Sequence, residues 1–124
     1  MDITKPEVDF PEGEPPKTLE VTDIWEGNGK AAGAGDTVQV HYVGVAYSTG
    51  EEFDSSWNRG DPLAFPLGRG RVIKGWDEGI VGMRVGGRRR LVIPAHLAYG
   101  DRGAGGAIAP GETLIFVVDL VDLK

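Results

Sequence analysis

The chain has no cysteine among its 124 residues. Disulfide bonds, thiol catalysis and cysteine–zinc sites are therefore excluded. It has only two histidines, His41 and His96, and their wide separation gives no metal-ligand spacing. No apolar run approaches the 18 or more residues of a membrane-spanning helix. The sequence therefore predicts a protein with no metal, no cofactor and no membrane association.

Basic residues are outnumbered, with 13 Lys and Arg against 19 Asp and Glu and a net charge of −6. Residues 1–30 contain eight of the acids and three lysines, so they carry −5 and the rest of the chain is close to neutral. This distribution does not predict nucleic-acid binding. The basic run at residues 88–90 lies between two glycines and an apolar stretch, so we interpret it as the solvated start of a strand rather than a phosphate site. Strand alternation would send Arg89 to the face opposite Arg88 and Arg90.

Residues 1–18 are acidic and rich in proline, with few apolar side chains. We expect an extended or mobile N-terminal arm, with polyproline II character near Pro15 and Pro16. The arm has neither the basic start nor the apolar run of a secretory signal, so a chain that begins here is expected in the cytoplasm. The length of the remainder, residues 19–124, predicts one domain.

Five segments have the alternation or the apolar composition of β-strands. They are residues 19–27, 37–47, 51–56, 88–95 and 113–123. The second segment is the clearest, because Val38, Val40 and Tyr42 share one face and His41 lies on the other. This pattern predicts a half-buried antiparallel strand. The last two segments are separated by a glycine-rich loop, residues 97–110.

Residues 72–83 form the one helical pattern. Its apolar residues recur at three- and four-residue steps, at Ile73, Trp76, Ile80 and Met83. Gly75, Gly79 and Gly82 interrupt this pattern, and each glycine costs a helix interior about 1 kcal/mol relative to alanine. The helix must therefore be stabilised by packing. The sequence predicts an α+β domain, in which a twisted antiparallel sheet wraps around one short helix.

Four short motifs stand in order along the chain: VHYVG at 40–44, EFDSS at 52–56, VIKGWDEG at 72–79 and AYGDRG at 98–103, ahead of TLIF at 113–116. This series resembles the FKBP family, the peptidyl-prolyl cis-trans isomerases that bind the macrolides tacrolimus and rapamycin. The resemblance covers residues 19–124. It implies a five-stranded antiparallel half-barrel around one short helix, and a monomer.

The resemblance also implies a shallow apolar pocket for proline-containing peptides, for unfolded or folding proteins, and for macrolides. Asp54 would supply the carboxylate at the pocket edge, with Arg59 beside it. Trp76 would form the floor, while the Tyr99 hydroxyl and the Ile73 amide would donate to ligand carbonyls. The other matching positions are Tyr42, Phe53, Leu63, Phe65, Val72, Ile108 and Phe116. The implied catalytic residues are Phe53, Asp54, Trp76 and Tyr99.

Several positions depart from the family pattern. Leu63 stands where an aromatic residue is usual, and Arg71 replaces a common acid. Ala104 and Ala107 replace larger residues in the loop, and Trp57 is added near the expected rim. These departures change the outer wall of the pocket and leave its floor intact.

The implied mechanism requires no nucleophile. Rotation about an X–Pro bond breaks amide resonance, with a barrier of about 18–20 kcal/mol, and the catalyst need only favour the twisted amide over the planar one. A module that binds proline-containing partners without turnover is the alternative, and a peptide isomerisation assay separates the two. An acid–base hydrolase is disfavoured, because it needs a histidine–carboxylate pair in the cleft and His41 faces away from Tyr42.

Without the motif order, the aromatic residues would be interpreted as ordinary core and Asp54 as a turn carboxylate. The arm also allows two interpretations. Phe10 followed by Pro11 resembles the family's substrates, so a tethered arm could visit the pocket at high local concentration. The other interpretation is a solubilising tail.

Overall fold

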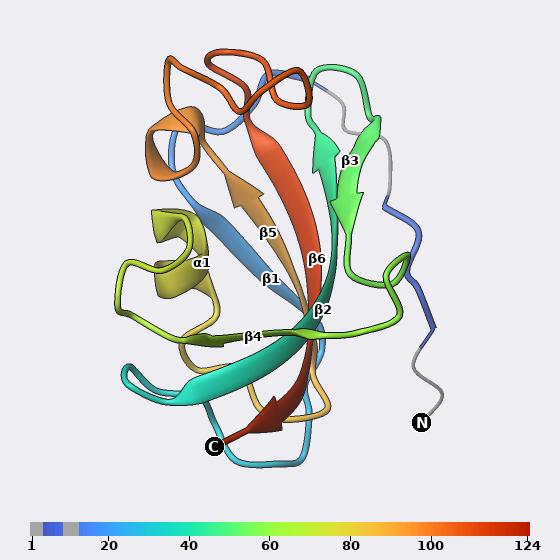
Figure 1. Cartoon of the computed structure of the whole chain (residues 1–124), viewed down its shortest axis with the longest axis vertical. Coiled ribbons are helices and arrows are strands. Elements are labelled where there is room, and N and C mark those ends of the chain that lie inside the picture. Colours follow the sequence, from blue (N-terminus) through green and yellow to red (C-terminus); the bar gives the residue numbers. More distant parts are fainter. Residues whose placement is uncertain (1–3, 9–12) are drawn as a thin grey trace.

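The structure is a computed structural model and describes residues 4–8 and 13–124. Its elements are β1 (Glu20–Trp25), β2 (Thr37–Ala46), β3 (Glu52–Ser55), β4 (Leu63–Pro66), α1 (Lys74–Gly79), β5 (Arg88–Ile93), a 3₁₀ turn η1 (Ala95–Leu97) and β6 (Leu114–Leu123). The strands form one antiparallel sheet in the order β1-β5-β6-β2-β3, and β4 also pairs with β2. Figure 1 shows this open, twisted sheet curling around α1.

The predicted α+β class is confirmed, but the described residues form six strands and not five. The sixth, β4, was missed because it has only four residues and ends in Pro66, too short for alternation to be visible. It pairs with the first half of β2, from Thr37 to Val40, while β3 pairs with the second half, from Val43 to Val45. The long strand β2 therefore holds two short strands along one edge.

The two faces of the sheet bury different clusters. The helix face carries Val38, Val40 and Tyr42, which pack with Trp76 and the rest of the main core. The outer face carries a smaller cluster of Val43, Val45, Val92 and Ile115. The predicted alternation of the second strand is confirmed. The side of the sheet that carries Val38, Val40 and Tyr42 is called the helix face, and the opposite side is called the outer face.

Helix α1 is shorter than the predicted pattern, since it covers only Lys74–Gly79. A Cβ on Gly75 would lie 2.4 Å from Cγ2 of Ile93, and one on Gly79 would lie 2.8 Å from Cδ2 of Leu91. Both glycines therefore allow the helix backbone to approach β5 closely. Ile80 and Met83 follow the helix and are 0% and 2% exposed, as core anchors should be. No helix in the described part of the chain is long and apolar enough to cross a membrane.

The prediction of a solvated strand end at residues 88–90 is wrong. Arg88 is 8% exposed, donates to both carboxylate oxygens of Asp119 at 2.7 and 3.1 Å, and lies over the ring of Trp25. Arg89 points to the other face, as alternation requires, where it pairs with Asp23 and donates to the carbonyl oxygen of Gly79 at the end of α1. Both are covered because β5 is an interior strand between β1 and β6.

The described part of the N-terminal arm contacts the outer face of the sheet. The Thr4 carbonyl oxygen accepts a hydrogen bond from Arg88, Lys5 pairs with Glu52, and Val8 packs against the outer cluster. In Figure 1 this arm runs beside β3, on the side away from α1. Phe10 and Pro11 lie outside the described residues. The division of the chain at residue 18 stays a prediction.

Candidate functional site

A cavity of about 180 Å³ opens on the helix face. It is lined by Tyr42, Phe53, Asp54, Leu63, Arg71, Val72, Ile73, Trp76, Tyr99 and Phe116. Nine of these are residues that the sequence analysis placed in the pocket, and they come from β2, β3, β4, β6, the start of α1 and the turn after η1. Residues far apart in the sequence therefore meet at one apolar cavity with a single carboxylate.

Three expected pocket residues lie beside the cavity rather than in its lining. Phe65 is buried on β4 with its ring 5.6 Å from that of Trp76, so it supports the floor from below. Ile108 is buried in the main core and borders a neighbouring groove that shares Phe53 with the cavity. Arg59 does not line the cavity itself, but it donates hydrogen bonds to two residues that do, Tyr42 and Asp54.

Aromatic side chains hold the indole of Trp76 in place. The rings of Tyr42 and Phe116 meet it nearly at right angles, with centroids 4.9 and 5.2 Å away, and Trp76 is only 4% exposed. Such edge-to-face contacts are favourable and directional. The indole nitrogen has no hydrogen-bond partner in the described residues. The floor thus offers a fixed, apolar aromatic surface to a small ring.

A β-bulge turns two consecutive residues toward the cavity. In the β2–β3 ladder, Gly44 pairs with Asp54 and Val45 pairs with Glu52, so Phe53 has no partner of its own. A bulged strand loses strict alternation at the extra residue. Phe53 and Asp54 therefore both line the cavity, whereas Glu52 pairs with Val45 of the outer face.

The polar edge of the cavity is a closed triangle of three side chains. The Tyr42 hydroxyl donates to Oδ2 of Asp54 at 2.6 Å, and Arg59 donates to Oδ1 of Asp54 and to the Tyr42 hydroxyl oxygen, both at 2.7 Å. The backbone N–H of Ser55 donates to Oδ1 of Asp54 at 2.9 Å. Each carboxylate oxygen is therefore held in place. We call Tyr42, Asp54 and Arg59 the edge triad.

The surroundings of the edge triad fix its protonation. Burial acts to raise the pKa of Asp54, but the hydrogen bonds from Tyr42 and Arg59 outweigh it and hold the pKa below its ordinary value. Burial raises the pKa of Tyr42, and the hydrogen bond to Asp54 adds to this shift. The carboxylate stays charged and the phenol stays neutral through the neutral pH range, so the triad provides fixed charge rather than a proton.

Two hydrogen-bond donors at the cavity have no partner among residues 4–8 and 13–124. The Tyr99 side chain is 42% exposed at the rim, and its hydroxyl makes no hydrogen bond to any described residue. Ile73 precedes the first residue of α1, and its amide N–H likewise has no acceptor within the described chain. The first N–H groups of a helix lack partners inside it. Both donors are thus available to a ligand.

Two contributors to the cavity were not among the expected pocket residues. Arg71 was expected only to change the outer wall, and it lines the cavity. The carboxylate of Asp77 accepts hydrogen bonds from the amides of Gly68 and Gly70 at 2.8 and 3.0 Å, which holds the loop that carries Arg71. The spaced glycines ahead of an acid in the first helical turn were the available signal.

Trp57 does not lie at the pocket rim, so that expectation is wrong. It packs on the outer face, where its ring stacks on His41 at 4.2 Å and an angle of 18°. His41 also hydrogen bonds to Oγ of Ser56, and His96 is exposed on η1. Neither histidine lines the cavity. No group of metal-ligating side chains occurs in the searched residues, 4–8 and 13–124.

Known proteins are similar to this chain over most of its length. The family model described as FKBP-type peptidyl-prolyl cis-trans isomerase matches residues 28–121. The chain is 75% identical over 122 residues to an FK506-binding protein of Streptomyces anulatus, with 98% of each protein covered. It is 58% identical over 90 residues to the peptidyl-prolyl cis-trans isomerase FPR2 of Saccharomyces cerevisiae. The aligned region covers 73% of this chain and 67% of FPR2. The solved structure of AtFKBP13 superimposes with a TM-score of 0.80 at 42% identity, covering 89% of this chain and 96% of the other.

Proposed function

Because this chain belongs to the FKBP-type peptidyl-prolyl cis-trans isomerase family, as its motifs predict, we propose that its cavity accelerates rotation about X–Pro bonds in folding proteins. The observation that supports this site is the fixed indole floor of Trp76 with the charged edge triad beside it. A prolyl ring rests on the indole, and the preceding amide lies at the triad.

The cavity acts by stabilising one amide geometry over another. A planar amide is strongly dipolar, whereas a twisted amide has lost conjugation and part of its charge separation. An apolar cavity therefore disfavours the planar form more than the twisted form. Each 1.36 kcal/mol of this difference corresponds to a tenfold increase in rate.

Polar groups at the cavity orient the substrate. The free hydroxyl of Tyr99 and the free amide of Ile73 each donate to a substrate carbonyl oxygen. The fixed carboxylate of Asp54 faces the twisting amide and favours its changed charge distribution. Phe53 and Phe116 complete the wall, with ring centroids 5.6 Å apart.

Isomerisation of a short X–Pro peptide tests the site. Trp76→Leu and Asp54→Ala should each lower kcat/KM by tenfold or more, while Glu20→Gln, an exposed change on β1, should leave it unchanged. Circular dichroism checks that every variant is folded. Full activity in folded Trp76→Leu and Asp54→Ala would show that this cavity is not the isomerase site.

We extend the proposal to macrolides of the tacrolimus and rapamycin type. Relatives of this chain carry the name FK506-binding protein, and the same cavity offers the aromatic floor and the two free donors. Arg71 at the wall alters the outer contacts. Rapamycin should inhibit the peptide assay competitively and raise the unfolding temperature. If this chain binds rapamycin but does not accelerate isomerisation of the peptide, the result would support a pure binding module instead.

A further inference from the structure

We propose that the N-terminal arm positions the edge triad, with Lys5 as the positioning residue. This inference rests on the proposed function of the cavity. The arm lies on the outer face of the sheet, where Lys5 bonds to Glu52 and Asn58. These two residues belong to the short segment 52–59, which also carries Asp54 and Arg59 of the edge triad.

A cluster of three side chains ties the arm to both ends of that segment. Lys5 Nζ lies 2.9 Å from Oε1 of Glu52 and donates to Oδ1 of Asn58 at 3.0 Å. Asn58 Nδ2 in turn donates to Oε2 of Glu52 at 3.1 Å. The ammonium group and the direct bond between Asn58 and Glu52 therefore together hold the start of β3 and the loop after it at a fixed separation.

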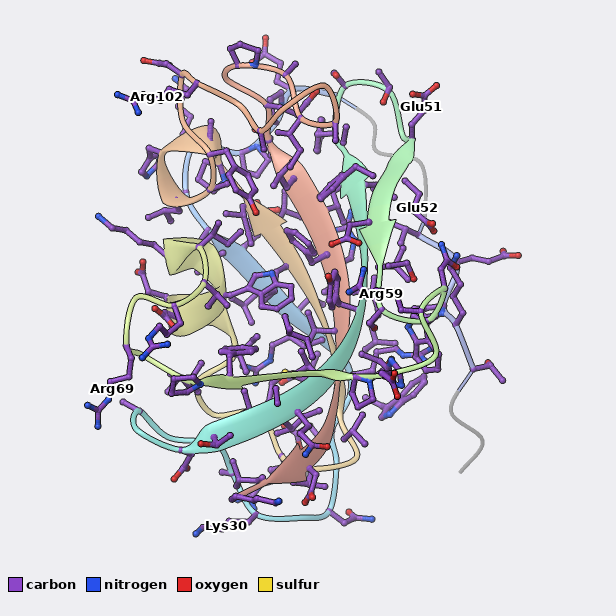
Figure 2. The ribbon with its side chains drawn as sticks, in the orientation of Figure 1. Lys30, Glu51, Glu52, Arg59, Arg69 and Arg102 are labelled. Atoms are coloured by element: carbon purple, nitrogen blue, oxygen red, sulfur yellow. The ribbon has the colours of Figure 1, made fainter. Side chains whose placement is uncertain are left out.

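The gripped residues are close neighbours of the triad along the backbone. Glu52 precedes the bulge that sets the side of Phe53 and Asp54, and Asn58 directly precedes Arg59. Figure 2 shows Glu52 and Arg59 along this one edge of the sheet, far from Arg69 and Arg102. A shift of the backbone at either end therefore changes the 2.7 Å contact between Arg59 and Asp54.

Part of the segment is held by backbone hydrogen bonds to the sheet, and the exposed part is held by its own turn bonds, by the side chain of Arg59 and by the arm. Ser56 is fixed, because its N–H donates to the Tyr42 carbonyl oxygen at 3.0 Å and its Oγ accepts from the Tyr42 N–H at 2.7 Å. Beyond it, Asn58, Arg59 and Gly60 are exposed. This half of the loop has its own turn bonds, from the N–H groups of Arg59 and Gly60 to the Ser56 carbonyl oxygen at 3.1 Å each, and Lys5 adds a bond from outside the segment.

The arm itself has a rigid anchor on the sheet. The Thr4 carbonyl oxygen accepts from Arg88 at 2.7 Å, and Arg88 is locked by its buried pair with Asp119. Val8 and Trp57 both pack against the outer cluster, and Trp57 stacks on His41. The chain is thus fixed to the sheet on both sides of Lys5, by Thr4 before it and by Val8 after it. The bonds of Lys5 to Glu52 and Asn58 therefore limit the movement of residues 52–59.

The expected effect concerns geometry more than global stability. Lys5 and Glu52 have side chains that are 38% and 34% exposed, and such ion pairs contribute little to unfolding free energy. Catalytic rates, in contrast, fall steeply when a positioned group moves by a fraction of an ångström to one ångström. Loss of the ammonium group should therefore lower the rate while the fold persists.

The test compares Lys5→Met with Lys17→Met, an exposed lysine of the arm with no ion pair in the described structure. We expect Lys5→Met to lower kcat for X–Pro peptides two- to fivefold, with KM and the unfolding midpoint little changed. Glu52→Gln should lower kcat by a similar factor. The double variant Lys5→Met/Glu52→Gln should have a kcat no lower than that of either single variant, because both changes remove the same contact. Lys5→Arg should restore most of the rate.

A second readout does not depend on activity. The carboxyl ¹³C shift of Asp54 reports its titration, and Lys5→Met should move that titration toward higher pH as the contact with Arg59 loosens. If the titration moves although the unmodified protein does not catalyse isomerisation, the positioning role stands and the proposed function fails. An unmoved titration and an unchanged kcat overturn the positioning role, as does an equal effect of Lys17→Met.

Discussion

Gly75→Ala tests why a helix with so many glycines is stable in this fold. On helix propensity alone, alanine should stabilise α1 by up to about 1 kcal/mol. The structure predicts the opposite. A Cβ at this position would lie 2.4, 2.7 and 2.9 Å from Cγ2, Cδ1 and Cγ1 of Ile93. Carbon atoms in good contact are about 3.5–4.0 Å apart, so Ile93 or the helix must move by about 1 Å.

Ile93 has little freedom to move. It is fully buried, lies on the interior strand β5, and pairs with Leu114 of β6. Its branched Cβ also restricts the side-chain rotamer. Overpacking of this kind costs about 1–3 kcal/mol. Subtracting the gain in propensity leaves a net loss of about 1 kcal/mol, and at most about 2 kcal/mol, in the free energy of unfolding.

Urea unfolding measures this loss, and two variants make it specific. Gly106→Ala is the control, because a Cβ there meets open space and its backbone φ is ordinary, so it should be neutral or stabilising by up to about 1 kcal/mol. Ile93→Ala removes all three close atoms at a cost of about 2–5 kcal/mol, and on that background Gly75→Ala should no longer destabilise. A stabilising Gly75→Ala in the unmodified chain would refute the close approach of α1 and β5.

Three further predictions concern the cavity and the outer face. Gly44→Ala would place a Cβ 2.6 Å from Cζ of Phe53, so it should push that ring into the cavity and raise KM for X–Pro peptides several-fold, while Glu20→Gln on β1 should not. Arg88→Met leaves Asp119 buried without its partner and should lower the unfolding free energy by about 3–5 kcal/mol in urea titrations; a loss below about 1 kcal/mol would contradict the buried pair. The folded-state pKa of Asp54 lies below its ordinary 3.8, so its contribution to stability is fully present above pH 3.8 and is lost as the pH falls through the folded-state pKa. The pKa of Tyr42 lies above 10.0, so its contribution is fully present below pH 10.0 and is lost as the pH rises through the folded-state pKa. Neither group titrates between about pH 5 and pH 9, and an Asp54 titration within that range, followed by NMR, would contradict the triad geometry.

The sequence predicted the fold class well because its strongest patterns are local. Alternation over residues 37–47 correctly separated the helix face from the outer face, since a ten-residue strand gives several repeats of the two-residue period. The helical spacing correctly marked Ile80 and Met83 as core. The sequence indicated that packing must stabilise this glycine-rich helix, and the structure identifies the partners as Ile93 and Leu91 of β5.

The wrong predictions concern features that a short stretch of sequence does not display. Strand β4 was missed because four residues cannot display a period. Residues 88–90 were interpreted as solvated, yet β1 and β6 cover both sides of their strand and Asp119 neutralises Arg88. Trp57 was expected near the rim, whereas it packs on the outer face with its ring stacked on His41.

The bulge in β3 explains how the candidate site can contain two adjacent residues. Strict alternation would send Phe53 and Asp54 to opposite faces, so an aromatic wall and a charged edge could not both come from this strand. Only the family resemblance placed both residues in one pocket, and it gave no mechanism for doing so. The unpaired Phe53 supplies that mechanism, and Gly44 completes it, because without a side chain it leaves room for Phe53 and Phe116 to meet above it. An insertion or deletion of one residue between Glu52 and Asp54 should therefore damage the cavity more than any single substitution in its wall, since it changes which of these side chains faces the substrate.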